Sequence, residues 1–194
     1  MIKKLIKSFL YRPNIKMLGS NSYIHLPRRL SGTNYIVIGD NFSMRSHGVL
    51  EALKTPTEQP LCHGNIIIGN DVYIGKFTQI FAMSQVQIGD GCVLSDNVYI
   101  SDNSHGFSPE GGLIMKQPLN SKGPITIGCD TFIGIGSVVM PGVVIGSHCV
   151  VGANSVVSKS FPDFSMVAGV PARLIKRYCK ENMAWIMPEV CDDV

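Results

Sequence analysis

The chain has 194 residues, the length of a single domain. Its net charge is only +3, so nothing in the composition indicates a large nucleic-acid-binding surface. The six cysteines include no CxxC pair, and no apolar run approaches the length of a transmembrane helix. We therefore expect a protein of the reducing cytoplasm, with neither a disulfide framework nor a zinc site.

The N-terminal segment, residues 1–16, is basic and partly amphipathic. Its apolar run is interrupted and no small-residue cleavage site follows, which argues against a signal peptide. We predict that residues 1–35 form an N-terminal cap, in which a short helix covers the open end of the structure that follows. The alternative is that this segment associates loosely with the anionic face of the inner membrane.

Aliphatic residues recur at every sixth position over residues 36–157. The most regular run comprises Ile127, Ile133, Val139, Ile145, Val151 and Val157, most of them followed by glycine. A period of six fits neither an α-helix nor a simple strand alternation, so it must come from a repeated structural unit. Three units, each a short strand and a turn, make one triangular coil with the aliphatic side chains stacked inside. The sequence therefore predicts an all-β fold, a parallel β-helix.

The repeat is interrupted twice in its first half. Residues 51–64 contain two prolines and no aliphatic rhythm, which predicts an irregular excursion. The phase then slips by two residues between Ile80 and Ile88, which indicates a bulge or a small insertion. Cys92 and Cys149 stand at compact inward positions, and we expect them to be small core residues.

The longest interruption is an inserted loop at residues 103–124, which contains His105 and Glu110. Loops of this length inside a compact repeat are more often functional than not. Residues 158–194 follow the repeat as a C-terminal tail. In it we predict an extended piece and then a closing helix from Leu174 to about Trp185.

The aliphatic-glycine hexapeptides, the loop with His105 and the tail Ala168-Gly169-Val170-Pro171-Ala172-Arg173 resemble those of the hexapeptide-repeat acyltransferases. Within that family the chain looks most like O-acetyltransferases of bacterial surface-polysaccharide synthesis and galactoside and maltose acetyltransferases. The resemblance implies a single acyltransferase domain over residues 1–194, with a left-handed β-helix that departs from the usual right-handed crossover. It also implies a homotrimer with each active site between two subunits.

Transfer of an acetyl group to a hydroxyl needs a base, and histidine suits this role because its ordinary pKa is about 6.5. His105 matches the loop histidine that acts as the general base in the family. Asp102 could orient the imidazole, and Glu110 is an equally placed competitor. Related enzymes often have a second histidine where this chain has Asn103, so the orienting partner stays open. The alternative is that His105 is an exposed loop residue with no role.

The other histidines carry weaker signals. His47 and His63 could line an acceptor site, although an exposed surface is the simpler interpretation. His148 falls on a repeat turn and is expected to face solvent. The spacing of these residues does not suggest a converging set of metal ligands, so we expect no metal requirement.

Acetyl-CoA is the co-substrate that the resemblance implies. In the family its pantetheine arm lies along the coil edge against backbone that glycines leave accessible, and Gly134, Gly136 and Ala153 are the matching positions. Its phosphates need cations, and Lys159, Arg173 and Lys176 gather where the coil ends. The alternative for these three residues is an ordinary solvated surface.

These observations predict a cytoplasmic, acetyl-CoA-dependent O-acetyltransferase that acts on a sugar hydroxyl in lipopolysaccharide (O-antigen) or capsule biosynthesis. No cysteine or serine stands beside a base, so direct attack is favoured over a covalent acyl-enzyme. The alternatives are a galactoside- or maltose-type acetyltransferase, an antibiotic acetyltransferase, or a non-catalytic β-helix scaffold. The acceptor, and whether its oxygen or nitrogen is acylated, stay open.

Overall fold

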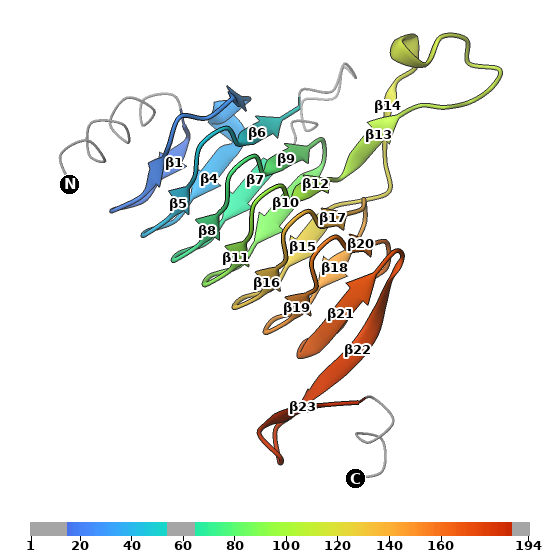
Figure 1. Ribbon diagram of the computed structural model, residues 1–194. Coiled ribbons are helices and arrows are strands. Elements are labelled where there is room, and N and C mark those ends of the chain that lie inside the picture. The colour runs from blue at the N-terminus through green and yellow to red at the C-terminus, as the bar shows by residue number, and fades with distance from the viewer. Residues whose placement is uncertain (1–14, 54–64, 188–194) are drawn as a thin grey trace.

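The computed structural model describes residues 15–53 and 65–187, and in it the chain winds into a three-sided prism (Figure 1). Successive strands enter successive sheets, so that every three strands complete one coil. Within each of the three sheets, neighbouring strands come from neighbouring coils and pair in parallel. Six coils stacked in this way form a left-handed parallel β-helix, as the repeat and the resemblance predict.

The strands are short. Sheet A contains β1 (Met17–Leu18), β4 (Ile36–Ile38), β7 (Asn65–Ile68), β10 (Gln85–Ile88), β15 (Ile125–Ile127) and β18 (Val144–Ile145). Sheet B contains β2 (Tyr23–Ile24), β5 (Ser43–Met44), β8 (Tyr73–Ile74), β11 (Val93–Leu94), β16 (Phe132–Ile133) and β19 (Val150–Val151). Sheet C contains β3 (Arg29–Ser31), β6 (Val49–Ala52), β9 (Gln79–Ala82), β12 (Tyr99–Ser101), β17 (Val138–Val139) and β20 (Val156–Val157).

The core is a set of three aliphatic ladders, one from each sheet. In sheet B, for example, Leu94 is in register with Ile133, and Ile133 with Val151; all three side chains are fully buried. The residue before each of them points outward, because successive side chains of a strand face opposite sides. Cys92 and Cys149 are also buried. The predicted inward phase of the repeat is therefore confirmed.

The edges of the prism are sharp turns that need a left-handed backbone conformation. At the edge between sheets A and B, Asn21, Asn41, Asp71, Asp130 and His148 have φ angles of 54 to 56°. Asparagine and aspartate tolerate this conformation better than most residues. Side chains also tie one turn to the next: the carboxylate of Asp90 accepts a hydrogen bond from the Asn70 N–H (2.7 Å).

The β-helix begins one coil earlier than we predicted. Strands β1, β2 and β3 lie within residues 17–31, which the sequence analysis assigns to the cap. Leu18 and Ile24 are buried there, and Leu30 packs against the same core. These three positions are also six residues apart, so the repeat already runs through this segment. Residues 1–14, where the cap helix was predicted, lie outside the described residues.

The phase slip near residue 84 is a local lengthening of one coil. Strands β9 and β10 have four residues each, and Ala82 and Val86 add a second buried side chain to each strand. The interpretation as a small insertion is therefore confirmed. The predicted excursion at 51–64 is wrong for residues 51 and 52, which belong to β6; residues 54–64 lie outside the described part.

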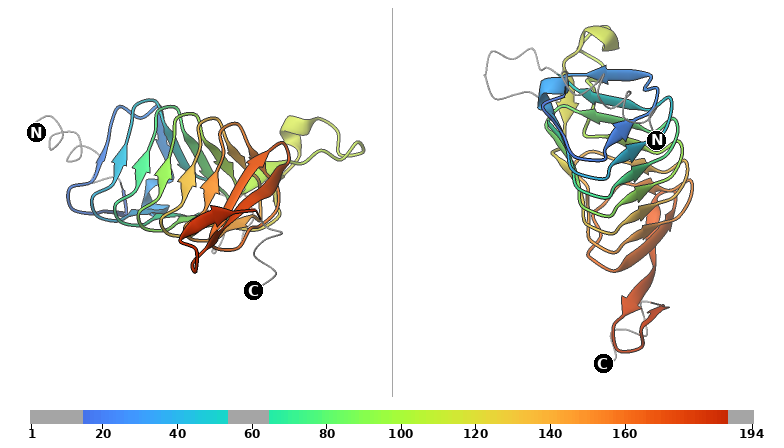
Figure 2. Two further views of the ribbon diagram at one scale, coloured as in Figure 1. Left: turned by 60° about the horizontal axis from the view of Figure 1, so that its bottom comes forward. Right: turned by 90° about the vertical axis from the view of Figure 1, so that its left-hand side faces the viewer.

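The predicted closing helix is wrong. After β21 (Ser165–Gly169), which pairs with β19, the chain turns back into β22 (Ala172–Cys179) and then β23 (Ala184–Ile186), both antiparallel (Figure 2). The last strand of sheet B would otherwise present unpaired backbone groups, and β22 pairs with them. In the described part of the chain, no helix is long and apolar enough to cross a membrane.

The inward phase can be tested by one substitution on the buried face of a strand and one on the exposed face. Ile133→Asp should lower the free energy of unfolding by more than about 4 kcal/mol or leave the protein insoluble, because it places a charge among aliphatic side chains. The matched control is Val144→Asp in sheet A of the next coil, whose side chain points outward and is 47% exposed. Chemical denaturation measures both. Equal losses of stability in the two variants would contradict the assignment of the buried face.

Candidate functional site

The inserted segment leaves the prism at the edge between sheets C and A. After β12 the chain forms an antiparallel hairpin of β13 (Asn103–His105) and β14 (Leu119–Ser121) and then enters β15 of the next coil. The hairpin and its tip project well beyond the prism (Figures 1 and 2). Along the chain, β6 of sheet C is likewise followed by β7 of sheet A after a long interval, of which residues 54–64 lie outside the described part. Both long departures from the repeat thus occur where a turn can be lengthened without breaking the ladders.

His105 is the last residue of β13 and is paired with Leu119 in the hairpin. It is exposed, and within residues 15–53 and 65–187 no ion pair or hydrogen bond involves its imidazole ring. The ring is therefore free to meet an acceptor or a neighbouring subunit.

The tip beyond His105 is held in shape by one side chain. The amide oxygen of Gln117 accepts a hydrogen bond from the Ser108 N–H (2.9 Å), and its nitrogen donates to the carbonyls of Ser108 (2.9 Å) and Gly112 (3.1 Å). A short 3₁₀ turn, η3 (Ile114–Lys116), precedes Gln117. The structural role of Gln117 was not predicted, because the sequence around a glutamine does not show whether its amide bonds to the backbone or to solvent.

Asp102 is fully buried. It accepts hydrogen bonds from the backbone N–H groups of residues 83–85 and from the side-chain amide of Asn103. No hydrogen bond joins it to the imidazole in the part of the chain that the structure describes. The structure therefore differs from the hypothesis that Asp102 orients the imidazole of His105 through a direct hydrogen bond. Glu110 is exposed at the tip and, among the described residues, forms no ion pair.

The three positions expected to accommodate pantetheine come together at the edge between sheets B and C. A Cβ on Gly134 would lie 2.6 Å from the Ala153 nitrogen, and Gly136 has a φ of +70°. Their N–H groups donate to the carbonyls of Val151 (2.8 Å) and Asp96 (3.0 Å). Both glycines thus have a reason in coil packing, and their N–H groups are already engaged. A role in coenzyme binding stays a prediction.

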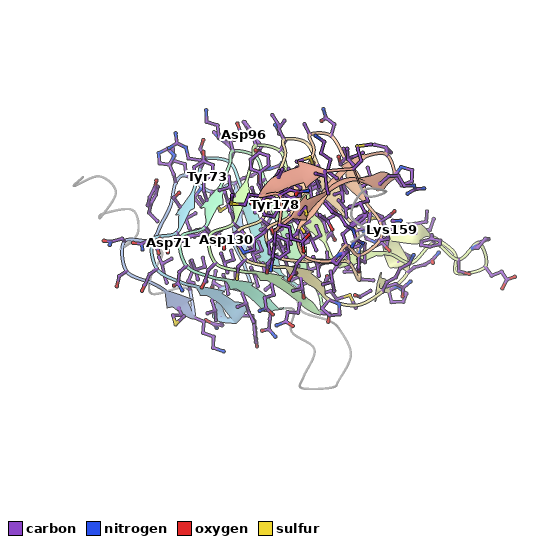
Figure 3. All side chains as sticks on the ribbon, turned by 90° about the horizontal axis from the view of Figure 1, so that it is seen from below. Asp71, Tyr73, Asp96, Asp130, Lys159 and Tyr178 are labelled. Carbon is purple, nitrogen blue, oxygen red and sulfur yellow. The ribbon has the colours of Figure 1, made fainter. Side chains whose placement is uncertain are left out.

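The three expected phosphate ligands share the C-terminal end of the prism but occupy different sides of it. Lys159 follows β20 at the edge between sheets C and A, with its Nζ 5.5 Å from the centre of the Phe161 ring. Arg173 and Lys176 lie on β22, opposite Ala168 and Met166. Figure 3 shows Lys159 well apart from Tyr178, which is also on β22. No ion pair involves any of the three in the described residues.

The remaining histidines do not gather. His47 is exposed and stacks on Phe77, with ring centres 5.0 Å apart. His148 is exposed, as predicted, and its Nδ1 lies 3.9 Å from the carboxylate of Asp130. His63 is outside the described residues. Over the described ranges, no group of three or more histidine, cysteine, aspartate or glutamate side chains is arranged to hold a metal ion.

The thiols of Cys92 and Cys149 are poor nucleophiles. Burial raises the pKa of Cys92 to about 11, and burial also raises the pKa of Cys149. Both side chains are therefore protonated at neutral pH, whereas a covalent mechanism needs the thiolate. This is consistent with direct attack on the donor.

Two profiles of one family match the chain. Residues 124–159 match the bacterial transferase hexapeptide of six repeats, and residues 65–102 match the hexapeptide repeat of succinyl-transferase. The prism is thus built from transferase-type hexapeptides. These matches and the fold agree with the resemblance to the hexapeptide-repeat acyltransferases. Among curated proteins, none matches significantly.

Several solved structures share the fold. AntD, an N-acyltransferase from Bacillus cereus, was solved with dTDP and 3-hydroxybutyryl-CoA; it is 22% identical, with a TM-score of 0.71 over 90% of this chain and 89% of that one. A maltose O-acetyltransferase from Clostridium difficile 630 is 24% identical, with a TM-score of 0.55 over 87% and 73% of the two chains. A hexapeptide-repeat-containing acetyltransferase from Vibrio cholerae is 23% identical, with a TM-score of 0.57 over 91% and 82%.

Thiol labelling tests the environment of the cysteines. In the folded protein at pH 7, iodoacetamide should modify the exposed Cys129 well before Cys92, of which only about one molecule in 10⁴ is ionised. Because folding raises the pKa of Cys92, the protonated thiol stabilises the fold, and this contribution should fade as pH rises from 9 towards 11. Peptide mapping by mass spectrometry follows each site. Labelling of Cys92 as fast as Cys129 would show that the core is open.

Proposed function

We propose that the protein transfers an acyl group from an acyl-CoA to a sugar by direct attack of the acceptor on the thioester. The observation that carries this proposal is the projecting hairpin, which presents an exposed and unengaged His105 at the edge of a transferase-type β-helix. The AntD structures support the choice of substrates, since one holds Coenzyme A together with dTDP-4-amino-4,6-dideoxyglucose.

His105 is the general base of the proposed reaction. Its neutral imidazole removes the proton from the acceptor group, the acceptor atom bonds to the carbonyl carbon, and the carbon–sulfur bond breaks to release coenzyme A. The protonated imidazole then gives its proton to the departing thiolate. The ring needs a partner to fix its orientation. Asp102 does not contact it within one chain, so Glu110 or a group of another subunit would fill this position.

The site is completed by a homotrimer in this proposal. Sheet B carries a row of outward side chains in register, Tyr73, Val93 and Phe132, which are 37 to 42% exposed. Partly exposed apolar rows of this kind are typical of subunit contacts. His105 and Lys159 both lie at the edge between sheets C and A, whereas Gly136, Ala153 and Arg173 lie towards the edge between sheets B and C. Two subunits are needed to bring these edges together.

The acceptor is proposed to be a sugar hydroxyl, in the synthesis of a surface polysaccharide (O-antigen or capsule) in the cytoplasm, with acetyl-CoA as donor. A second candidate is N-acylation of a nucleotide-linked amino sugar. The similarity to AntD favours the second, because its TM-scores of 0.71 to 0.73 exceed the 0.55 of the maltose O-acetyltransferase. Alkaline treatment of the product separates them, since an acetyl ester is hydrolysed and an amide survives.

Replacing the proposed base tests the mechanism. His105→Ala should lower kcat by roughly 10²–10⁴, the range that loss of a general base usually costs. Binding of acetyl-CoA and the oligomeric state should not change, because His105 lies outside the repeat and fills no core position. The assay is release of free thiol with a competent acceptor, alongside calorimetry of donor binding.

The same variant separates two other outcomes. Near-normal turnover would exclude His105 as the base and leave the fold unaffected. Loss of donor binding would show instead that His105 belongs to the coenzyme pocket. Glu110→Ala should cause a smaller loss of kcat if Glu110 orients the ring, and almost none if it does not.

The proposed phosphate ligands are tested through the donor. Changing Lys159 and Arg173 together to alanine should raise the KM for acetyl-CoA more than it lowers kcat, because cations on remote phosphates supply uniform binding. The KM for acetyl-CoA of each single variant then shows on which side of the prism the phosphates bind. An unchanged KM in the double variant would exclude both residues and direct attention to Lys176 and Arg177.

A further inference from the structure

The side chain of Asp102 lies in a site built from backbone donors. Its carboxylate oxygens accept hydrogen bonds from the N–H groups of Met83 (2.7 Å), Ser84 (2.7 Å) and Gln85 (2.8 Å). The Nδ2 of Asn103 donates to the same carboxylate (3.1 Å). The residue is 0% exposed. A buried carboxylate is tolerated only when donors surround it, and here they do.

The position of these donors explains why a carboxylate is needed. In this prism the N–H groups of one coil donate to carbonyls of the next: Gly69 N–H to Ile88 O (2.9 Å), and Gly89 N–H to Ile127 O (2.8 Å). Residues 83 and 84 form the turn from sheet C to sheet A, and Gln85 begins β10. At the same point of the next coil the chain departs into the hairpin, and these three N–H groups donate to a carboxylate where the ladders elsewhere use backbone carbonyls. The carboxylate of Asp102 takes their place.

The hairpin is attached to the prism by two legs. In the first leg, the Ser101 hydroxyl donates to the Asn103 carbonyl (2.9 Å), and Asn103 is tied to Asp102. In the second leg, the Gly142 N–H donates to the Gly123 carbonyl (3.1 Å). Each leg is thus held by a different coil. Because a strand rises about 3.3 Å per residue, His105 lies only about 7 Å beyond the anchored Asn103.

We propose that Asp102 is a positioning residue, which locks the first leg of the hairpin to the preceding coil and thereby fixes the place of His105. It acts through the backbone of β13 and not by contact with the imidazole. The consequence for catalysis rests on the proposed function, whereas the anchoring itself does not. Small displacements of a catalytic group are costly, so a loosened leg reduces turnover even when His105 is present.

Proteolysis of the hairpin tests the anchor without an activity assay. In Asp102→Asn an amide nitrogen faces backbone N–H donors, so the first leg should open more often. Trypsin should then cleave after the exposed Lys116 or Lys122 at least about tenfold faster than in the wild type. The matched control is Asp96→Asn. Its carboxylate accepts one backbone N–H, from Lys76 (2.7 Å), at another edge, and cleavage should stay at the wild-type rate.

A milder variant covers the case in which Asp102→Asn does not fold. Asn103→Ala removes only the amide bond to the carboxylate and should accelerate the same cleavages to a smaller degree. Wild-type cleavage rates in the folded Asp102→Asn protein, or in Asn103→Ala if only that variant folds, would overturn the proposal.

The action through His105 is tested by a double-mutant cycle. Asp102→Asn should lower kcat by about 10–100-fold with donor binding intact, and should cost nothing more in a His105→Ala background. An equal loss in both backgrounds would overturn the claim that Asp102 acts through His105. If His105→Ala is fully active, the proposed function fails, and the cleavage rates still decide whether Asp102 anchors the hairpin.

Discussion

The structure depends on the hydrogen bonds that join each coil to the next. They require every coil to present its carbonyl groups at the same height and in the same register as the coil before it. The aliphatic ladders inside the prism keep that register, because a strand that slipped by one residue would turn its buried side chains to solvent. The repeat meets both conditions. Together they leave little room for insertions within the three faces of the prism.

Insertions are therefore confined to the places where the repeat can be interrupted. An insertion on a face would break a ladder, whereas an insertion at an edge only lengthens a turn. His105 lies in such an insertion, at the edge between sheets C and A. The interruption leaves the preceding turn without its acceptors, and Asp102 supplies them. The same residue thus repairs the β-helix and fixes the hairpin that the interruption creates.

Much of the fold could be predicted from the sequence, since the six-residue period follows directly from the geometry of a coil. The first coil was missed because the basic segment before it suggested a cap. The C-terminal strands were missed for a different reason. Residues 172–179 alternate only weakly in polarity, and what makes them a strand is the open edge of sheet B, which no local pattern reveals.

The site was predictable in its residue types but not in their contacts. His105 could be singled out because a histidine in a long polar loop is a chemical signal in itself. The hydrogen-bond partners of Asp102 could not be predicted, because three backbone N–H groups some 17 to 19 residues away carry no signature in the sequence. The cations at the C-terminal end appear close in sequence, yet β22 turns back and carries Arg173 and Lys176 to another side than Lys159.

The most direct test of the central claim is calorimetric titration of acetyl-CoA into the purified protein, with dephospho-acetyl-CoA as the reference ligand. We predict saturable binding with one site per chain, and weaker binding of the reference ligand because it lacks a phosphate for the cations. Absence of saturable acetyl-CoA binding by the assembled protein would contradict the assignment as an acyl-CoA-dependent transferase.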